Sequence, residues 1–188
     1  LPKTGNNNEA DDRLCFLMSA FSSCLNRKPN NRGGIFRAGT GSAMEYVLSA
    51  IGVGATADGR KAGGAFASSF SPAITTKLDG PLSVVLSFTK PDMSKTINGG
   101  PLTMEMHDTV FRNDEGVKKV AMLVKAYIDR GGHQLQLNSV NRDTLLDAQA
   151  HPENYPNLIV RVWGWSGYFV ELDRIYQDHV ISRTEFGV

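Results

Sequence analysis

The segment with the most unusual chemistry is Arg161-Val162-Trp163-Gly164-Trp165-Ser166-Gly167-Tyr168-Phe169. A glycine between two tryptophans is atypical of a simple turn, because turns favour small polar neighbours. We expect the two large aromatic side chains to bury Gly164 and to keep water away from its backbone. The alternative is a packing role, in which Gly164 only allows two elements to approach closely.

The residue types that serve most enzymes are present, but they are scattered along the chain. The histidines form no HxxxH or HExxH pattern, so no zinc site is predicted. No GxSxG segment is present to supply a nucleophilic serine. Isolated carboxylates such as Glu105 and Glu171 are typical of solvated or paired side chains. An ordinary hydrolase or metalloenzyme therefore has no support. The histidines are His107, His133, His151 and His179.

The two cysteines, Cys15 and Cys24, lie in one predicted helix with no CxxC spacing and no histidine nearby. This setting predicts buried structural thiols and favours neither a nucleophile nor a metal ligand. Two cysteines cannot form a disulfide scaffold, which favours a reducing compartment.

A glycine-rich segment, residues 52–64, has two possible interpretations. It contains glycines where tight turns need a positive φ. It is also a candidate phosphate loop, but it lacks the GxxxxGK[ST] spacing and a strand–loop–helix context. The tight-turn interpretation is therefore favoured.

The composition sets wider limits. The 188 residues suffice for one domain, and 41% hydrophobic residues suffice for a core. A net charge of +1 argues against a nucleic-acid partner or a polybasic membrane surface. No apolar run approaches the ~20 residues that span a bilayer, and no secretory signal is expected. The first residue is Leu1, which suggests a piece of something longer.

Hydrophobic periodicity predicts helices over 9–25, 114–130, 142–150 and 174–183, with Asn8, Asn113, Asn141 and Asp173 as their N-caps. In the helix over 114–130 the expected buried stripe is Val117, Val120, Ala121, Val124, Tyr127 and Ile128. Strands are expected over 102–107, 133–140 and 158–162. Segments 43–51 and 81–89 fit either type. A strand, a helix and a returning strand indicate a βαβ unit, so the predicted class is α/β with a parallel pair.

The segment around Gly164 resembles the radical signature of the glycyl radical enzymes, Arg-Val-small-Gly-Tyr-Ser. Further matches follow in order along the chain. They are Pro2-Lys3-Thr4-Gly5-Asn6, Arg32-Gly33-Gly34-Ile35-Phe36-Arg37-Ala38-Gly39, residues 54–63, Gly131-Gly132-His133-Gln134-Leu135-Gln136-Leu137-Asn138, Leu145-Leu146-Asp147-Ala148-Gln149, and Ile181-Ser182-Arg183-Thr184-Glu185. The resemblance covers essentially the whole chain.

The resemblance implies that Gly164 stores a radical. A partner activase of the radical S-adenosylmethionine type, with an iron–sulfur cluster, would install it, so no bound cofactor or metal is expected in this chain. The radical would then pass to a cysteine thiol, and oxygen would cleave the backbone at Gly164. This chemistry implies an anaerobic cytoplasm. The expected surroundings of the radical are Arg161, Trp163, Trp165, Ser166 and Arg183. Arg183 is expected to anchor the last helix beside the radical loop, or else to lie on the surface.

The family places its thiyl cysteine in a Gly-Cys-x-Glu loop, which neither Cys15 nor Cys24 matches. The resemblance therefore implies an incomplete enzyme, the C-terminal part of a ten-stranded α/β barrel that ends in the radical loop and a C-terminal helix. Another polypeptide would supply the cysteine, and a small accessory subunit is compatible with this organisation. Residues 1–130 would form barrel strands and helices, and residues 131–188 the glycyl radical domain, as one continuous unit.

The Trp-Gly-Trp pattern resembles the branch of the family that acts on arylacetates or hydrocarbons. We therefore expect anaerobic C–C bond chemistry, as in an arylacetate decarboxylase, a lyase. The alternatives are a fumarate-adding synthase of aromatic or alkyl succinates, a spare part that replaces an oxygen-cleaved C-terminus, and a non-enzymatic α/β module that binds an anion. Known spare parts are shorter and carry a radical loop like that of pyruvate formate-lyase.

Overall fold

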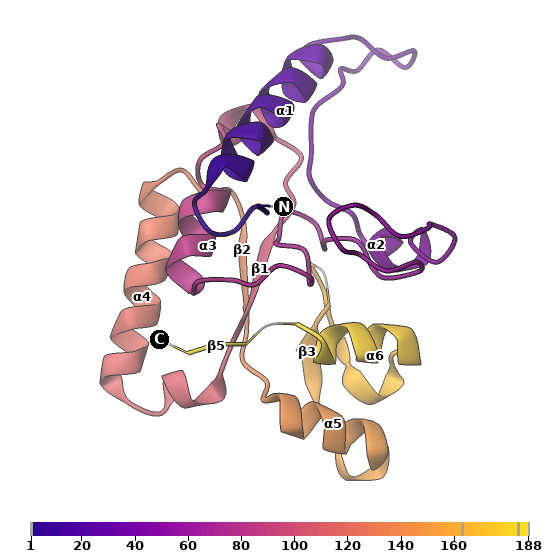
Figure 1. The fold of residues 1–188 in the computed structure, drawn as a ribbon, viewed down its shortest axis with the longest axis vertical. Coiled ribbons are helices and arrows are strands. Elements are labelled where there is room, and N and C mark those ends of the chain that lie inside the picture. Colours follow the sequence, from indigo (N-terminus) through magenta and orange to yellow (C-terminus); the bar gives the residue numbers. More distant parts are fainter. Residues whose placement is uncertain (1, 163, 184, 188) are drawn as a thin grey trace.

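The computed structural model describes residues 2–162, 164–183 and 185–187. Its centre is a parallel sheet of order β2-β1-β5, made of β1 (Leu102–Met106), β2 (Leu135–Asn138) and β5 (Glu185–Phe186). Helix α4 (Asp114–Asp129) connects β1 to β2 and lies along the sheet (Figure 1). The predicted α/β class and the predicted parallel βαβ unit are thus confirmed. The short strand β5 was not predicted.

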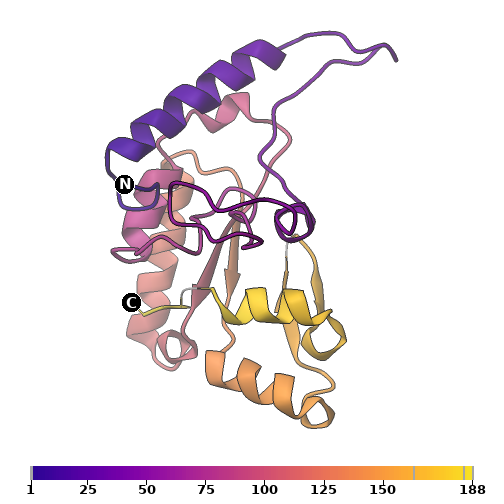
Figure 2. The same ribbon diagram turned by 45° about the vertical axis from the view of Figure 1, so that its right-hand side comes forward.

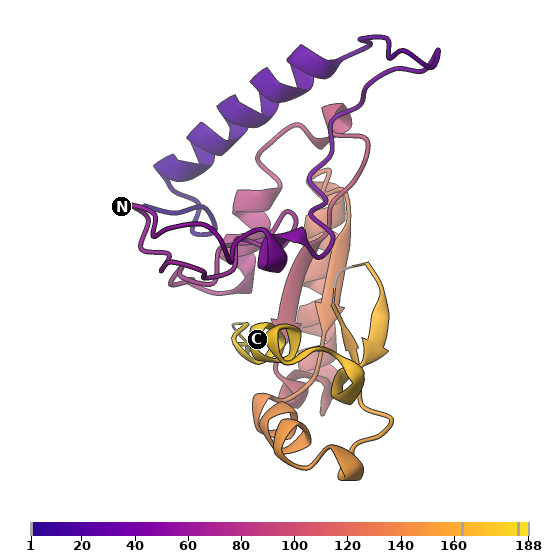
Figure 3. The same cartoon turned by 90° about the vertical axis from the view of Figure 1, so that its right-hand side faces the viewer.

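A second, antiparallel pair consists of β3 (Ile159–Arg161) and β4 (Ser166–Tyr168). This hairpin lies on the side of the sheet away from α4, next to α5 (Arg142–Ala150) and α6 (Arg174–Ile181) (Figures 1 and 3). A cluster of buried side chains joins the hairpin to the two helices. Its members are Leu145, Ala148, Val160, Val162, Phe169, Val180 and Ile181.

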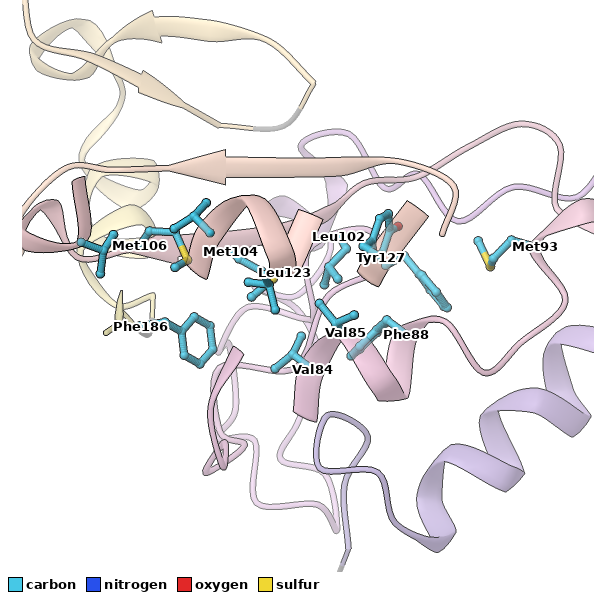
Figure 4. Close-up of a cluster of buried hydrophobic side chains, with 13 residues drawn as sticks. Val84, Val85, Phe88, Met93, Leu102, Met104, Met106, Leu123, Tyr127 and Phe186 are labelled. Atoms are coloured by element: carbon cyan, nitrogen blue, oxygen red, sulfur yellow. The ribbon is translucent and has the colours of Figure 1, made fainter. Parts of the chain in front are cut away.

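Alternation along β1 and β2 gives the sheet two different faces, because side chains in a strand point alternately to opposite sides. Leu102, Met104 and Met106 face α4 and α3 (Pro81–Phe88), where Val84, Val85 and Phe88 complete a core (Figure 4). The parallel register places Thr103 beside Gln136 and Glu105 beside Asn138 on the opposite face. The sheet therefore has an apolar face and a polar face.

The remaining helices are α1 (Glu9–Leu25) and α2 (Glu45–Leu48). The predicted bounds of α1 are confirmed, and Asn8 caps it through its side chain, as Asn113 and Asn141 cap α4 and α5. Asp173 precedes α6 without a side-chain capping bond. Helix α1 lies at the opposite end of the molecule from α5 (Figure 2).

Three details of the predicted burial are wrong. In α4, Val120, Val124 and Tyr127 belong to the core as predicted, but Leu123 is buried in place of Val117, Ala121 and Ile128, which are exposed. Cys24 is exposed and Cys15 is half-buried, because α1 contacts the core mainly through Leu14 and Met18. Neither thiol is the buried structural group that the sequence predicts.

The glycine-rich segment 52–64 is a pair of turns, with positive φ at Gly59 and Gly63. The Arg60 guanidinium lies inside it and donates hydrogen bonds to the carbonyl oxygens of Gly54 and Gly64. This arginine is 6% exposed. Its donors are directed at the loop's own carbonyls, which favours the tight-turn interpretation over a phosphate loop.

Candidate functional site

Gly164 lies in the turn that joins β3 to β4. The turn is closed by the Val162 N–H, which donates to the Trp165 carbonyl oxygen at 3.1 Å. Gly164 has a φ of +61°, a conformation that side chains disfavour. A Cβ at this position would have no described atom within 4 Å. Within this chain the glycine is therefore favoured by its backbone conformation, and the close-approach interpretation is not supported.

Among the described residues, no aromatic side chain covers Gly164. Gly164 is exposed, and Trp165 is 38% exposed. The Trp165 ring lies over Gly167, where an added Cβ would come within 2.5 Å of it. The other flanking residue, Trp163, lies outside the described residues. The expected burial of Gly164 is thus not seen among the described residues, and the part of it that involves Trp163 stays a prediction.

The polar face of the sheet holds the backbone of this hairpin. The Gly164 N–H donates to Gln136 Oε1 at 3.0 Å. Asn138 Nδ2 donates to the Arg161 carbonyl oxygen at 3.1 Å and to Glu105 Oε1 at 2.9 Å. Among the described residues, no backbone ladder joins β2 to β3, so side chains provide the polar link between them.

Arg183, which follows α6, reaches the same backbone. Its Nη1 lies 2.7 Å from Glu105 Oε1 and donates to the Arg161 carbonyl oxygen at 3.0 Å. Its Nη2 donates to the Val162 carbonyl oxygen at 2.8 Å. The side chains of Arg183 and Glu105 are 7% and 10% exposed. A buried charge is costly unless it is paired and hydrogen-bonded, and here each charge meets the other.

We call Glu105, Asn138 and Arg183 the clasp. Its contacts fix two consecutive carbonyl groups, those of Arg161 and Val162, just before Gly164. Arg161 and Ser166, also expected around Gly164, face each other across the hairpin, and Arg161 Nη1 donates to Ser166 Oγ at 3.1 Å. Both are exposed, so this contact lies on the outer side of the turn.

His179 lies beside the clasp but is not a conventional acid or base. It is 7% exposed, and its ring centroid is 4.8 Å from that of Tyr46. Burial, together with the nearby Arg183 cation, lowers the pKa of His179 to about 3. The ring is therefore neutral at physiological pH.

Three residues of this site were not identified from the sequence as functional: Gln136, Asn138 and Glu105. Glu105 was considered only as an isolated carboxylate. The signal that identifies them is alternation in two adjacent parallel strands, which places all three on one face. Which face meets Gly164 depends on the tertiary arrangement. Among residues 2–162, 164–183 and 185–187, no three His, Cys, Asp or Glu side chains gather as a metal site, and no helix is long and apolar enough to cross a bilayer.

Comparison with known proteins gives matches over the whole chain. A family model described as "Glycine radical" matches residues 66–170. Trans-4-hydroxy-L-proline dehydratase of Clostridioides difficile is 32% identical over 185 residues, which are 98% of this chain and 23% of that protein. Indoleacetate decarboxylase of Tractidigestivibacter scatoligenes is 39% identical over 134 residues, 71% of this chain and 15% of that protein.

The structural match is equally extensive. The glycerol-bound B12-independent glycerol dehydratase of Clostridium butyricum superposes with a TM-score of 0.94 and 34% identity over 100% of this chain and 24% of that one. The chain thus spans about a quarter of the length of the relatives that it matches throughout. The resemblance seen in the sequence is confirmed, and the chain belongs to the glycyl radical enzyme family.

Proposed function

We propose that this chain is the radical-bearing C-terminal part of a glycyl radical enzyme and that Gly164 stores the radical. The observation that supports this best is the set of hydrogen bonds that side chains make to the backbone around Gly164. Side chains of β2 and of the segment after α6 hydrogen-bond to the backbone of Arg161, Val162 and Gly164 in an exposed turn, which is more than a connecting turn requires.

The chemistry fits a residue without a side chain. A hydrogen atom leaves the α-carbon of Gly164, with one proton and one electron, and is taken up by a radical S-adenosylmethionine activase that carries an iron–sulfur cluster. The α-carbon becomes planar, and the unpaired electron is shared with the amide nitrogen and the carbonyl group. Oxygen would attack this centre, which supports a cytoplasmic role under anaerobic conditions.

The radical would pass to a cysteine thiol outside this chain. Cys15 and Cys24 both belong to α1, which lies apart from the β3–β4 hairpin (Figure 3). We infer that the segment with the thiyl cysteine completes a ten-stranded barrel with the strands described here. It would also cover Gly164, which this chain leaves exposed.

For the reaction itself we propose arylacetate decarboxylation, on the basis of the Trp-Gly-Trp segment and of the 39% identity to indoleacetate decarboxylase. Dehydration of a hydroxylated substrate is the second candidate. It is favoured by coverage, because the dehydratase matches extend over 98–100% of the chain and the decarboxylase match over 71%.

The test uses the complete enzyme, activated anaerobically by its activase. We expect an electron paramagnetic resonance doublet that is absent in Gly164→Ala, and chain cleavage at Gly164 after exposure to air. Competent activation without a Gly164-dependent signal would refute the storage role. Release of CO2 from indoleacetate or 4-hydroxyphenylacetate supports decarboxylation, whereas turnover of glycerol or 1,2-propanediol alone supports dehydration.

A further inference from the structure

Gln136 makes a direct contact with the peptide group of Gly164. Its Oε1 accepts the Gly164 N–H at 3.0 Å, and its side chain is 6% exposed. Gln136 belongs to β2, and the parallel register with Thr103 of β1 fixes its position. A rigid strand thus presents an acceptor to the amide of a turn residue.

The hairpin alone does not require this bond. The turn is already closed by the bond from Val162 to Trp165, and Gly164 is exposed. The other half of the Gln136 amide, Nε2, is buried without a hydrogen-bond partner among the described residues. Within the described residues, the bond to the Gly164 N–H is therefore the one hydrogen bond of the Gln136 side chain.

Radical formation gives this contact a chemical consequence. Loss of the α-hydrogen spreads the unpaired electron onto the amide nitrogen, which makes the N–H group a stronger donor. An acceptor fixed in advance stabilises that state without rearrangement. Building on the proposed function, we infer that Gln136 is a positioning residue for the radical glycine: it orients the Gly164 peptide plane and stabilises the radical through the amide N–H.

Two variants of the complete enzyme separate this role from general stability. Gln136→Glu keeps an acceptor oxygen but replaces the unpartnered amide donor with a second, charged carboxylate oxygen, whereas Gln136→Leu removes the acceptor. The matched control is Gln149→Leu, because Gln149 Nε2 makes an exposed hydrogen bond to Asp178 Oδ1 and none to the backbone of the hairpin. The readouts are spins per chain after activation and the hyperfine coupling of the exchangeable Gly164 N–H proton, identified by comparing H2O with D2O.

We expect Gln149→Leu to keep the spin yield and the N–H coupling of the parent enzyme. Gln136→Glu should keep the spin yield and change the coupling, because a charged acceptor replaces a neutral one at the same N–H group. In Gln136→Leu the coupling should change and the yield should fall about fivefold, the factor that corresponds to one typical net hydrogen bond. An unchanged coupling and yield in Gln136→Leu would overturn the inference while leaving radical storage intact. If Gln136→Leu does not fold, an unchanged coupling in Gln136→Glu overturns it equally. A parent enzyme without the doublet refutes the proposed function itself.

Discussion

The two faces of the β1–β2 pair differ in the contacts that they make: one packs against helices, and the other hydrogen-bonds to the β3–β4 hairpin. On one face, Leu102, Met104 and Met106 pack against α3 and α4 through hydrophobic contacts, which do not depend on orientation as hydrogen bonds do. On the other, Gln136 and Asn138 hydrogen-bond to the backbone of the hairpin at 3.0 and 3.1 Å. Glu105 accepts from the side chains of Asn138 and Arg183 at 2.9 and 2.7 Å. The apolar face therefore stabilises the fold, and the polar face positions the backbone around Gly164. Substitutions on the first face should change mainly the free energy of unfolding, and those on the second should also change the radical.

The largest expected effect is loss of the radical in Gly164→Ala. Alanine at φ +61° costs about 1–2 kcal/mol of stability, yet the glycyl signal should vanish completely. Gly131→Ala is the matched control, because Gly131 also has a positive φ and open space around it. It should show a similar loss of stability in urea denaturation and a full radical signal. Equal signals from the two variants would contradict the assignment.

Next in size is the clasp. Arg183→Met leaves the buried Glu105 carboxylate unpaired, which should reduce the free energy of unfolding by about 3–5 kcal/mol. Arg183→Met combined with Glu105→Gln removes both charges and should recover part of that loss. Urea denaturation of the single and double variants of the complete enzyme measures the coupling. Strictly additive losses would show that the pair acts as two independent groups.

On the apolar face, Leu102→Ala should reduce the free energy of unfolding by about 2–5 kcal/mol, because it removes a fully buried side chain. The spectrum of the Gly164 radical should stay unchanged in the folded fraction. Thermal denaturation and paramagnetic resonance on the same sample check both statements. A changed N–H coupling in this variant would mean that the two faces are not separable.

The last effect is absent at neutral pH and concerns acid conditions. The pKa of His179 is about 3 in the folded chain, where the ring is buried, and 6.5 without that burial. As pH falls, the unfolded chain therefore takes up a proton on this residue before the folded chain does. Stability should therefore decline from pH 6.5 towards 3, with at most about 1.4 kcal/mol per pH unit from this residue. His179→Leu should flatten the decline in urea denaturation at stepped pH. An equally steep decline in the variant would assign it to other groups.

Much of this arrangement was predictable from the sequence, because periodicity and caps are local properties. Helix α1 and its Asn8 cap, helix α5 and the parallel β1–β2 pair follow the predicted pattern. Strands β4 and β5 were missed, since segments this short carry too little periodicity. The burial of α4 was predicted in part: Val120, Val124 and Tyr127 belong to the core, but the helix is apolar over a wider arc than its neighbours cover, so the predicted Val117 and Ile128 are exposed.

The candidate site was also predictable only in part. Gly164 and Arg183 were identified through a resemblance, and the structure shows what Arg183 contacts. The direction of Gln136 and Asn138 depends on where the hairpin lies against the sheet, which no local pattern specifies. The boundary between residues 130 and 131 remains a prediction, and the parallel sheet contains strands from both sides of it.

Strand β5 has a consequence for a molecule whose backbone is broken at Gly164. The part after the break contains Arg183, which is paired with Glu105, and Phe186, which is buried in the main core. It also contributes β5 to the ladder with β1 and α6 to the second core cluster. The two pieces are therefore fastened to each other without the covalent link. A nicked molecule would keep its size and shape in native buffer and separate only on denaturation.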